Sequence, residues 1–316
     1  MREKSRKDIK SIKEEQARSE RLSEAVNFPS VILLDTTSYC NLRCTMCGHK
    51  DMTRIKGNMK WELFTKLIDE IAEENRNARV WMVFFGEALL LKGKKSHNVY
   101  DMIKYAKDKG LTDVVLNSNG NLMDNEASEN LISCGLDAIY IGIDAFNPFA
   151  YSKVRVGGDY NVVVNNVIKL IKLKEKNKVD CPDVYVQFVE MEENKEQIKD
   201  FVNFWRKQGA KVKIRPKVSW AGIVEASNLT LSQQERWPCY WAMRSLSVTD
   251  QGKVVTCAVD VDAKFVVGDV NNQSIKKIWN GPLKDFRRKH LERRYNELPW
   301  PCRDCKDWQA ARAEFI

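Results

Sequence analysis

Seven of the nine cysteines stand at spacings typical of metal ligands, and no other feature constrains the fold so strongly. Three of them, Cys40, Cys44 and Cys47, form a C-x3-C-x2-C run directly after the apolar segment 31–34. A four-iron cluster takes one thiolate per iron, so three thiolates leave one iron with an open position. The spacing therefore predicts a metal centre that can bind a further ligand. A zinc site and three buried thiols without metal are the alternatives.

Short apolar runs alternate with helical patterns along the chain. Strands are expected at 31–34, 80–85, 113–116, 138–143, 184–189 and 212–214, and helices at 61–74, 98–109, 125–133, 160–177 and 195–208. Strands that alternate with helices favour parallel β/α units with right-handed crossovers. Six such units predict an α/β fold, a partial (β/α)6 TIM-like barrel with its active site at the carboxyl ends of the strands. The cysteine run follows the first strand and therefore falls at that end.

A second set of cysteines lies in the last third of the chain. Cys239 and Cys257 flank a predicted hairpin at 246–256, and Cys302 and Cys305 form a C-x2-C pair. Together with a helix near 274–279, they predict a small β-hairpin/helix domain that a metal centre would hold together. We therefore expect a charged helical extension at 1–28, the barrel at 29–220 and the metal domain at 221–316. For this second centre, too, a structural zinc site is the alternative to an iron–sulfur cluster.

The first cysteine run resembles the signature of the radical S-adenosylmethionine (SAM) enzymes. In that family SAM fills the open position of a [4Fe-4S] cluster, and reduction of its sulfonium releases a 5′-deoxyadenosyl radical that abstracts hydrogen from the substrate. Gly86 and Glu87 match part of the family's Gly-Gly-Glu-Pro segment, whereas Phe85 and Ala88 depart from it. The match implies that Gly86 and Glu87 hold the SAM amino group, a contact that suits a carboxylate.

Other positions resemble the family's SAM contacts less closely. Ser118 and Asn119 stand where relatives have a Thr-Asn-Gly segment, which implies a hydrogen bond to the SAM ribose. Gly142 stands where many relatives have serine, so this chain offers no hydroxyl there. Met46 stands where an aromatic residue is more usual, and its thioether can pack against the adenine.

The second cysteine set resembles the SPASM domain of radical SAM maturases. Because no cysteine follows Cys305, the chain is similar to the shortened form called twitch, which carries one auxiliary [4Fe-4S] cluster with four thiolate ligands. The twitch dehydrogenases, such as the aminocyclitol dehydrogenase of the butirosin pathway, share this pattern. The resemblance implies that hydrogen is abstracted from a hydroxyl-bearing carbon of a sugar- or aminocyclitol-like substrate, and that the auxiliary cluster accepts the second electron.

Other functions remain open at this point. A radical SAM epimerase of a sugar or glycan would need a thiol as hydrogen donor, and the unassigned Cys134 and Cys181 are both predicted away from the active face. A peptide maturase usually carries a leader-binding module, for which residues 2–25 are too short. A cluster protein that binds nucleic acid would need neither the β/α rhythm nor Gly86 and Glu87. The sequence favours a dehydrogenase, with an epimerase as the runner-up.

No motif fixes the catalytic side chains. Arg155, Gln187 and Arg215 are predicted near the barrel mouth, where an arginine suits a carboxylate or a phosphate. His49 and His97 are candidate bases near the same face. The expected partners are a small, polar, hydroxylated substrate and a flavodoxin- or ferredoxin-type electron donor.

The overall composition limits the partners and the cellular compartment that can be expected. The net charge of +9 is spread along the chain, and its densest run, at 287–290, is predicted to be the solvated face of a helix. Nucleic acid is therefore not expected as a partner. No apolar run approaches the ~18 residues of a membrane span, and no signal peptide is recognisable. Cysteines at metal spacings favour ligation over disulfides and hence a reducing compartment, so a cytoplasmic enzyme is expected.

Overall fold

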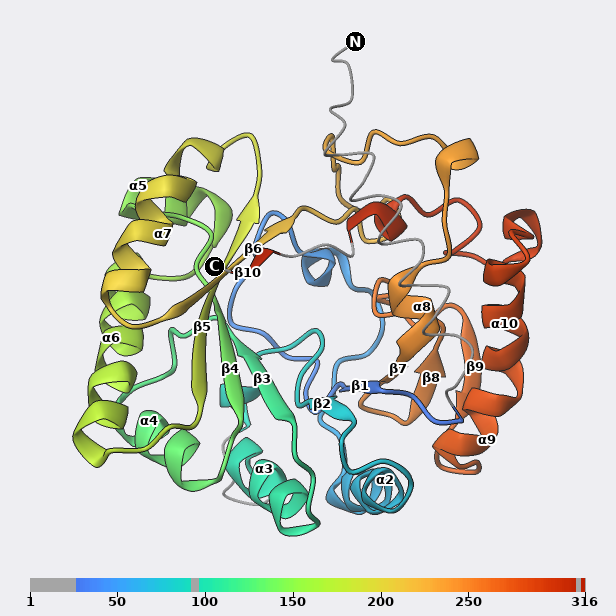
Figure 1. Cartoon of the computed structure of the whole chain (residues 1–316), viewed down its shortest axis with the longest axis horizontal. Helices are drawn as coiled ribbons and strands as arrows, with labels where there is room; N and C mark the ends of the chain where they lie inside the picture. Colours follow the sequence, from blue (N-terminus) through green and yellow to red (C-terminus); the bar gives the residue numbers. More distant parts are fainter. Residues whose placement is uncertain (1–26, 92–96, 311–313, 316) are drawn as a thin grey trace.

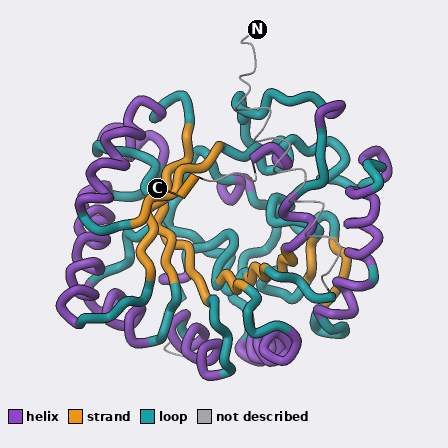
Figure 2. The backbone as a smooth tube through the Cα atoms, in the orientation of Figure 1, coloured by secondary structure: helices purple, strands orange, loops and turns teal. Residues whose placement is uncertain are grey.

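The computed structural model describes residues 27–91, 97–310 and 314–315, so most of the extension predicted at 1–28 lies outside the described residues. Six strands pair in parallel and in sequence order. They are β1 (Val31–Leu34), β2 (Arg79–Trp81), β3 (Val114–Ser118), β4 (Ala138–Gly142), β5 (Asp183–Glu190) and β6 (Lys211–Pro216). The sheet curves but does not close (Figures 1 and 2), which confirms the predicted partial barrel.

Helices cover the outer face of these strands (Figure 1). They are α2 (Trp61–Glu74), α3 (Val99–Asp108), α4 (Asn125–Ser133), α5 (Pro148–Val154), α6 (Tyr160–Asn177) and α7 (Ile198–Lys207). Each longer helix turns an apolar face inward; in α2 the buried residues are Phe64, Leu67, Ile68, Ile71 and Ala72. Side chains cap the first turns of α3, α4, α5 and α6, namely Asn98, Asp124, Asn147 and Asp159. None of the helices in the described ranges has the length and apolarity that a membrane crossing requires.

The interior of the barrel is lined in rows, because alternate residues of each strand face inward. One row holds Tyr140, Tyr185 and Lys211, and the next holds Gly142, Gln187 and Lys213. Val189 and Arg215 follow in the row nearest the carboxyl ends of β5 and β6. The rings of Tyr140 and Tyr185 stack with centroids 4.5 Å apart, and Trp81 packs beside them. An aromatic layer therefore lies below a polar layer inside the barrel.

The carboxyl-terminal part of the chain continues the same sheet. Strand β7 (Ser245–Val248) pairs in parallel with β1, and β8 (Lys253–Val255) and β9 (Val266–Asp269) follow in antiparallel order. The predicted hairpin is confirmed, and its turn needs Gly252, whose φ is +85°. The pairing of β1 with β7 was not expected: hairpin and barrel share one sheet. A boundary at 220/221 stays a prediction.

The remaining elements are short. Helices α8 (Tyr240–Arg244), α9 (Ile275–Asn280) and α10 (Pro282–Leu291) accompany β7–β9, and β10 (Glu314–Phe315) pairs antiparallel with β6 at the opposite edge of the sheet (Figure 1). Short 3-10 turns are found at Gly48–Asp51, Ala88–Leu90, Lys195–Gln197, Gln233–Glu235, Tyr295–Glu297 and Asp307–Ala310.

The basic run at 287–290 lies on α10 and is only partly solvated, so this prediction was wrong for two of its residues. Arg287 and His290 are buried, and the Arg287 guanidinium lies 3.6 Å from the centroid of the Trp279 ring. Burial lowers the pKa of His290 to about 3, which keeps its ring neutral. The two residues continue the apolar face of α10 that begins at Leu283 and Phe286, at the spacing of a buried helix stripe.

Candidate active site and metal centres

The loop after β1 carries the first three cysteines at the carboxyl ends of the strands, as predicted. Two backbone hydrogen bonds tie it to the segment that ends α5: Arg43 N donates to Val156 O (2.9 Å) and Thr45 N donates to Val154 O (3.0 Å). From the other side, the indole Nε1 of Trp220 donates to the carbonyl oxygen of Met46 (2.7 Å). The loop is therefore held between the fourth β/α unit and the segment that leaves β6.

The thiols of this loop lie in a partly buried environment. Burial raises the pKa of Cys40, and it raises the pKa of Cys47 to about 11, with the charges of Cys44 and Cys40 adding to the effect. The N–H groups of Leu42 and His49 point at the sulfurs of Cys40 and Cys47, with N···S distances of 3.5 Å. Hydrogen bonds to sulfur tune iron–sulfur clusters. Buried thiols of this kind ionise when a metal supplies the compensating charge.

Gly86, five residues after the end of β2, lies against the backbone that leads into the cysteine loop. A Cβ at this position would overlap the carbonyl oxygen of Thr37 and lie 2.7 Å from that of Tyr39, so only glycine permits the approach. The next amide, Glu87 N, donates to Tyr39 O (2.8 Å). The Gly-Glu pair therefore supports the backbone of the cysteine loop.

Glu87 is buried, and its carboxylate already accepts hydrogen bonds within the protein. Oε1 accepts from Ser118 Oγ (3.0 Å) and Leu89 N (3.2 Å), and Oε2 accepts from Asn119 N (2.7 Å). Burial raises the pKa of Glu87, and these donors counter the rise. A carboxylate can accept about four hydrogen bonds, so one position on Oε2 is left for a cation.

Ser118 and Asn119 lie beside Glu87, but the Ser118 hydroxyl already takes part in hydrogen bonds within the protein. Its proton goes to Glu87, and its oxygen accepts from Gly120 N (3.0 Å). Asn119 Nδ2 donates to Asn41 Oδ1 (2.8 Å) in the cysteine loop. Ser118 can thus offer a ribose only an acceptor lone pair.

A buried ion pair occupies the place where relatives carry a serine. Arg155 Nε donates to Asp144 Oδ2 (2.7 Å), and its Nη2 forms a second, shorter contact with the same oxygen. Nη1 of Arg155 lies 3.6 Å from Cys44 Sγ. Burial lowers the pKa of Arg155, but the Asp144 carboxylate and the Cys44 sulfur more than offset this and raise it. A Cβ on Gly142 would collide with this guanidinium, coming within 2.7 Å of Cζ, so glycine at 142 makes room for Arg155.

The other two catalytic candidates face the barrel interior. Gln187 Nε2 donates to Asn117 Oδ1 (3.0 Å) in the polar layer. Arg215 points the same way from β6, and its buried Nε has no hydrogen-bond partner among the described residues. Burial lowers the pKa of Arg215; the Asp144 carboxylate opposes this and Arg155 adds to it.

Met46 and the two histidines are placed differently. Met46 is buried against Leu42 and Val154, within the loop's own apolar cluster. His49 is buried and its Nε2 bonds Ser38 O (2.8 Å), so its ring supports the loop. His97 stacks on Trp61 of α2 at 3.6 Å, outside the barrel. The geometry thus favours neither histidine as a catalytic base.

Three residues of the site were missed by sequence reasoning: Asp144, Lys213 and Trp220. The signal for Lys213 was present, because Lys211, Lys213 and Arg215 alternate with buried Val212 and Ile214 and so share one face. Asp144 and Trp220 have φ values of 57° and 51°, and no local pattern predicts such a backbone.

The four cysteines of the second set come from three separate segments. Cys239 precedes α8, Cys257 follows β8, and the pair Cys302 and Cys305 follows the short turn Tyr295–Glu297. Burial raises the pKa of all four thiols, to about 12 for Cys305, and the charge of Cys239 raises the values of the other three. The thiols therefore lie near enough to influence one another's ionisation, with Cys257 and Cys302 buried and Cys239 and Cys305 half-buried.

Thiolate donors suit two kinds of metal centre, zinc and iron–sulfur clusters. Within the described ranges, no three His, Cys, Asp or Glu side chains lie close enough together to hold a single metal ion. A zinc ion draws its thiolates to about 2.3 Å. A four-iron cluster binds each thiolate at a different iron and accepts thiols set further apart. Three thiolates in the first set and four in the second fit the thiolate ligation of iron–sulfur clusters.

The segment after β6 connects the two cysteine sites. Asp307, two residues after Cys305, accepts hydrogen bonds from Ser219 N (2.5 Å) and Ala221 N (3.0 Å). Between these two amides stands Trp220, whose indole holds the Met46 carbonyl of the first loop. The Asp307 N–H in turn points at Cys305 Sγ (3.2 Å). A short chain of hydrogen bonds therefore runs from one site to the other.

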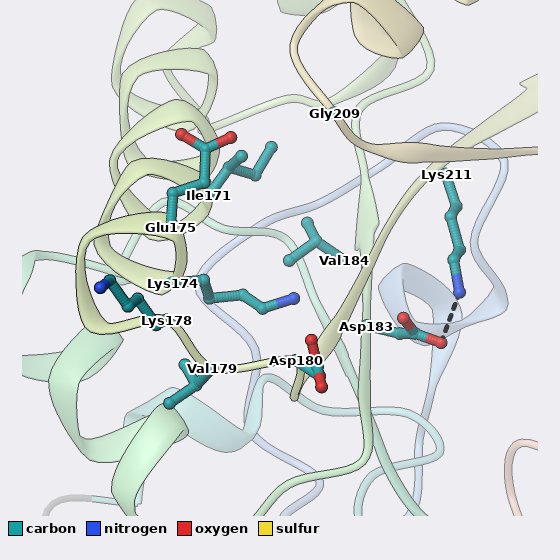
Figure 3. A pocket seen from close by; sticks show the side chains of 10 residues that line it. All are labelled: Ile171, Lys174, Glu175, Lys178, Val179, Asp180, Asp183, Val184, Gly209 and Lys211. Atoms are coloured by element: carbon teal, nitrogen blue, oxygen red, sulfur yellow. Dashed lines mark hydrogen bonds and ion pairs between the residues drawn. The ribbon is translucent and has the colours of Figure 1, made fainter.

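A surface pocket at the amino-terminal ends of β5 and β6 lies away from this chemistry. Figure 3 shows its lining, which includes Lys174 and Glu175 of α6 and the ion pair of Lys211 with Asp183 (2.7 Å). Active sites of β/α barrels form at the other end of the strands. This pocket is therefore not the candidate site.

Comparison with known proteins accounts for both cysteine sites. The model of the radical SAM superfamily matches residues 34–205, more than half of the chain. The chain belongs to the radical SAM superfamily. A model of the SPASM iron–sulfur cluster-binding domain matches residues 239–306 of this radical SAM enzyme. Its cofactors are therefore a [4Fe-4S] cluster with SAM and an auxiliary cluster, as predicted.

The radical SAM enzyme is similar to two curated proteins over about half of its length. One is the tungsten-containing aldehyde ferredoxin oxidoreductase cofactor-modifying protein of Pyrococcus furiosus, with 28% identity over 55% of this chain and 47% of that protein. The other is a probable GTP 3′,8-cyclase of Methanocaldococcus jannaschii, with 30% identity over 57% of this chain and 56% of that protein. The chain thus spans about half the length of these relatives.

Solved structures agree with the fold of the radical SAM enzyme over nearly its whole length. BtrN in complex with AdoMet and 2-DOIA matches with a TM-score of 0.61 at 19% identity, covering 87% of this chain and 92% of BtrN. SuiB of Streptococcus suis bound to S-adenosylmethionine matches with a TM-score of 0.66 at 10% identity, covering 91% of this chain and 75% of SuiB. At these identities the likeness concerns the fold.

Proposed function

We propose that this radical SAM enzyme is a dehydrogenase that oxidises a hydroxyl-bearing carbon of a small, polar, sugar- or aminocyclitol-like molecule to a ketone. When bound, the SAM-ligated cluster supplies the 5′-deoxyadenosyl radical, and the auxiliary cluster supplies an electron acceptor. The substrate loses a hydrogen atom from carbon, a proton from its hydroxyl group and one electron. BtrN, which shares the fold, is solved with AdoMet and 2-DOIA, and this supports a small-molecule substrate.

The placement of the nine cysteines carries the proposal. Four thiols gather in the second site, enough to ligate every iron of one cluster and leave no position for substrate. The two remaining thiols have surroundings other than the first site. Cys134 is buried in the apolar core at the end of α4, and Cys181 is exposed in the loop before β5. Neither is placed to return a hydrogen atom to a substrate radical, which an epimerase requires.

The proposal assigns roles to the seven cysteines at metal spacings and to Gly86 and Glu87. Cys40, Cys44 and Cys47 ligate the SAM-binding cluster, and Cys239, Cys257, Cys302 and Cys305 ligate the auxiliary cluster. Glu87 offers its free lone pair to the SAM ammonium group, and Gly86 keeps the backbone close to it. A flavodoxin- or ferredoxin-type electron donor and a cytoplasmic location belong to the same proposal, because both clusters need a reducing compartment.

A second candidate is radical cyclisation of a nucleotide. It is favoured by the 30% identity to a probable GTP 3′,8-cyclase, which extends over about half of each chain. Such an enzyme would release no ketone, so product analysis separates the two.

The test uses the full chain, reconstituted anaerobically with iron and sulfide and supplied with SAM and dithionite. Sugars and aminocyclitols deuterated at one carbinol carbon are offered, and deuterium in 5′-deoxyadenosine and the ketone product are both measured. A Cys302→Ala/Cys305→Ala variant should form deuterated 5′-deoxyadenosine without ketone, whereas Cys134→Ala should behave as wild type.

Iron analysis provides the control. Wild type should hold about eight irons per chain and a Cys40/Cys44/Cys47→Ala variant about four. An epimeric product that takes up solvent deuterium, or a ketone formed without the auxiliary cysteines, would refute the dehydrogenase mechanism.

A further inference from the structure

The barrel interior contains a cation that lacks an anion. Arg79 at one end of the interior pairs with Asp113 (2.8 Å), and Lys211 pairs with Asp183 (2.7 Å; Figure 3). Arg215, two residues after Lys213 on the same face of β6, makes no hydrogen bond or ion pair with any residue that the structure describes, and its Nε is buried. Arg79 and Lys211 are thus paired with carboxylates at the amino-terminal ends of β2 and β6, whereas Arg215, at the carboxyl end of β6, has no such pair among the described residues.

The carboxylate whose charge acts on Arg215, that of Asp144, is already bound to other groups. Asp144 Oδ2 is held by Arg155, and Oδ1 accepts a hydrogen bond from Val189 N (2.6 Å). Asp144 therefore moderates the field at Arg215 without contacting it. Arg215 is half-buried, and a buried guanidinium nitrogen without a hydrogen-bond partner is unfavourable, which is why such groups are normally paired or bind a ligand.

A second cation lies one row below Arg215. The ammonium group of Lys213 lies 4.9 Å from the centroid of the Tyr140 ring and 5.8 Å from that of Trp81. The groups that face it come from four strands: Arg79, Trp81, Tyr140, Gln187 and Arg215. Burial, together with Arg215 and Arg79, lowers the pKa of Lys213 to about 7, so an anion placed here would restore its charge.

From this geometry we infer that Arg215 and Lys213 bind an anionic group of the substrate, a phosphate or a carboxylate, above the aromatic layer of Tyr140, Tyr185 and Trp81. The inference rests on the proposed function, because it names the class of molecule that enters the site. It narrows the proposed substrate class, because the ammonium group of an aminocyclitol would meet two like charges. The chain would instead take a hydroxylated molecule with an acidic group, such as a sugar phosphate or a sugar acid.

The test is a binding experiment on the cluster-loaded full chain with SAM present and no reductant, so that no turnover occurs. Calorimetry compares glucose 6-phosphate, gluconate, glucose and glucosamine as probes. The two acidic probes should bind at least about tenfold more tightly than glucose, with glucosamine weakest. Equal binding of all four, or preference for glucosamine, would overturn the inference. Which acidic probe binds better decides between phosphate and carboxylate.

Variants on β6 test whether the affinity for the acidic probes depends on Arg215. Arg215→Met should weaken the better acidic probe by about tenfold or more, while Arg215→Lys retains part of the affinity. Lys211→Met, on the same strand and face but already paired with Asp183, is the matched control and should bind as wild type. In thermal unfolding without probe, Arg215→Met should be at least as stable as wild type, because it removes an uncompensated charge. A marked loss of stability would mean that Arg215 is structural and would overturn the inference.

SAM affinity of the same variants separates the substrate from the cofactor. If Arg215→Met loses SAM binding and keeps binding of the acidic probe, Arg215 serves the methionine carboxylate and the inference is wrong. Because binding is measured without turnover, the outcome does not depend on the dehydrogenase mechanism. Tight binding of acidic probes with no ketone formed from any acidic alcohol would refute the mechanism and keep the anion site.

Discussion

Gly142→Ala tests whether the Arg155–Asp144 pair depends on the absence of a side chain at 142. The added Cβ would come within 2.7 Å of Arg155 Cζ and 3.1 Å of Nη1, and it would overlap Nη2. Arg155 has little freedom to yield, because it is buried and bound to Asp144 through Nε and Nη2. Breaking a buried ion pair costs about 3–5 kcal/mol. Replacing glycine regains about 0.4–1 kcal/mol through the unfolded chain, so a net loss of about 2–4.6 kcal/mol is expected.

Urea unfolding of the anaerobic, cluster-loaded protein measures this loss, and a double-mutant cycle identifies its cause. In an Arg155→Met background the guanidinium is absent, and the shorter, flexible side chain can move aside. Gly142→Ala should therefore cost less than about 1 kcal/mol there. A loss within about 0.5 kcal/mol for Gly142→Ala alone would show that the guanidinium moves away without losing Asp144. An equal loss in both backgrounds would place the strain in the strand backbone. Either result refutes the account.

Three further perturbations have defined outcomes. Gly86→Ala forces a Cβ into the Thr37 carbonyl, which has no freedom to rotate away, so the protein should keep about four irons in the auxiliary site and lose those of the SAM site, as iron analysis would show. Trp220→Phe keeps the ring but removes the donor to Met46 O, and thermal unfolding should report a loss of about 1 kcal/mol; no change would mean that the bond is dispensable. Sulfate keeps its charge between pH 6 and 9, so its affinity should fall as pH rises through about 7, where Lys213 loses its proton, and the fall should be absent in Lys213→Met.

The elements of the fold that depend on local hydrophobic periodicity and residue spacing could be predicted from the sequence. The helices at 61–74, 125–133 and 160–177 are predicted with the bounds that the structure gives, because each has a buried apolar stripe. The same holds for the order of the six strands and for the position of the cysteine loop after β1. These features are local, and a chain with such patterns has few ways to bury its apolar faces.

Contacts between segments that lie far apart in the sequence could not be predicted from it. Nothing near Ser245 indicates that it pairs with Val31, 214 positions earlier, because the pairing is decided by the closing geometry of the whole sheet. The ion pair between Arg155 and Asp144 was not predicted from the sequence for a different reason. Gly142 was interpreted as the absence of a hydroxyl, whereas the structure shows that the space is filled by a side chain from the next loop.

The pairing of β1 with β7 has a consequence for anyone who would study the barrel alone. Cutting the chain after β6 would remove β7, the neighbour of β1 on that side, and leave a row of unpaired N–H and C=O groups along Val31–Leu34. Such an edge is apolar, since Ile32 and Leu34 are fully buried, and exposed apolar edges recruit strands from other molecules. A truncated barrel would therefore tend to aggregate before any cluster could be inserted. The auxiliary domain protects the edge of the strand whose end carries the radical chemistry.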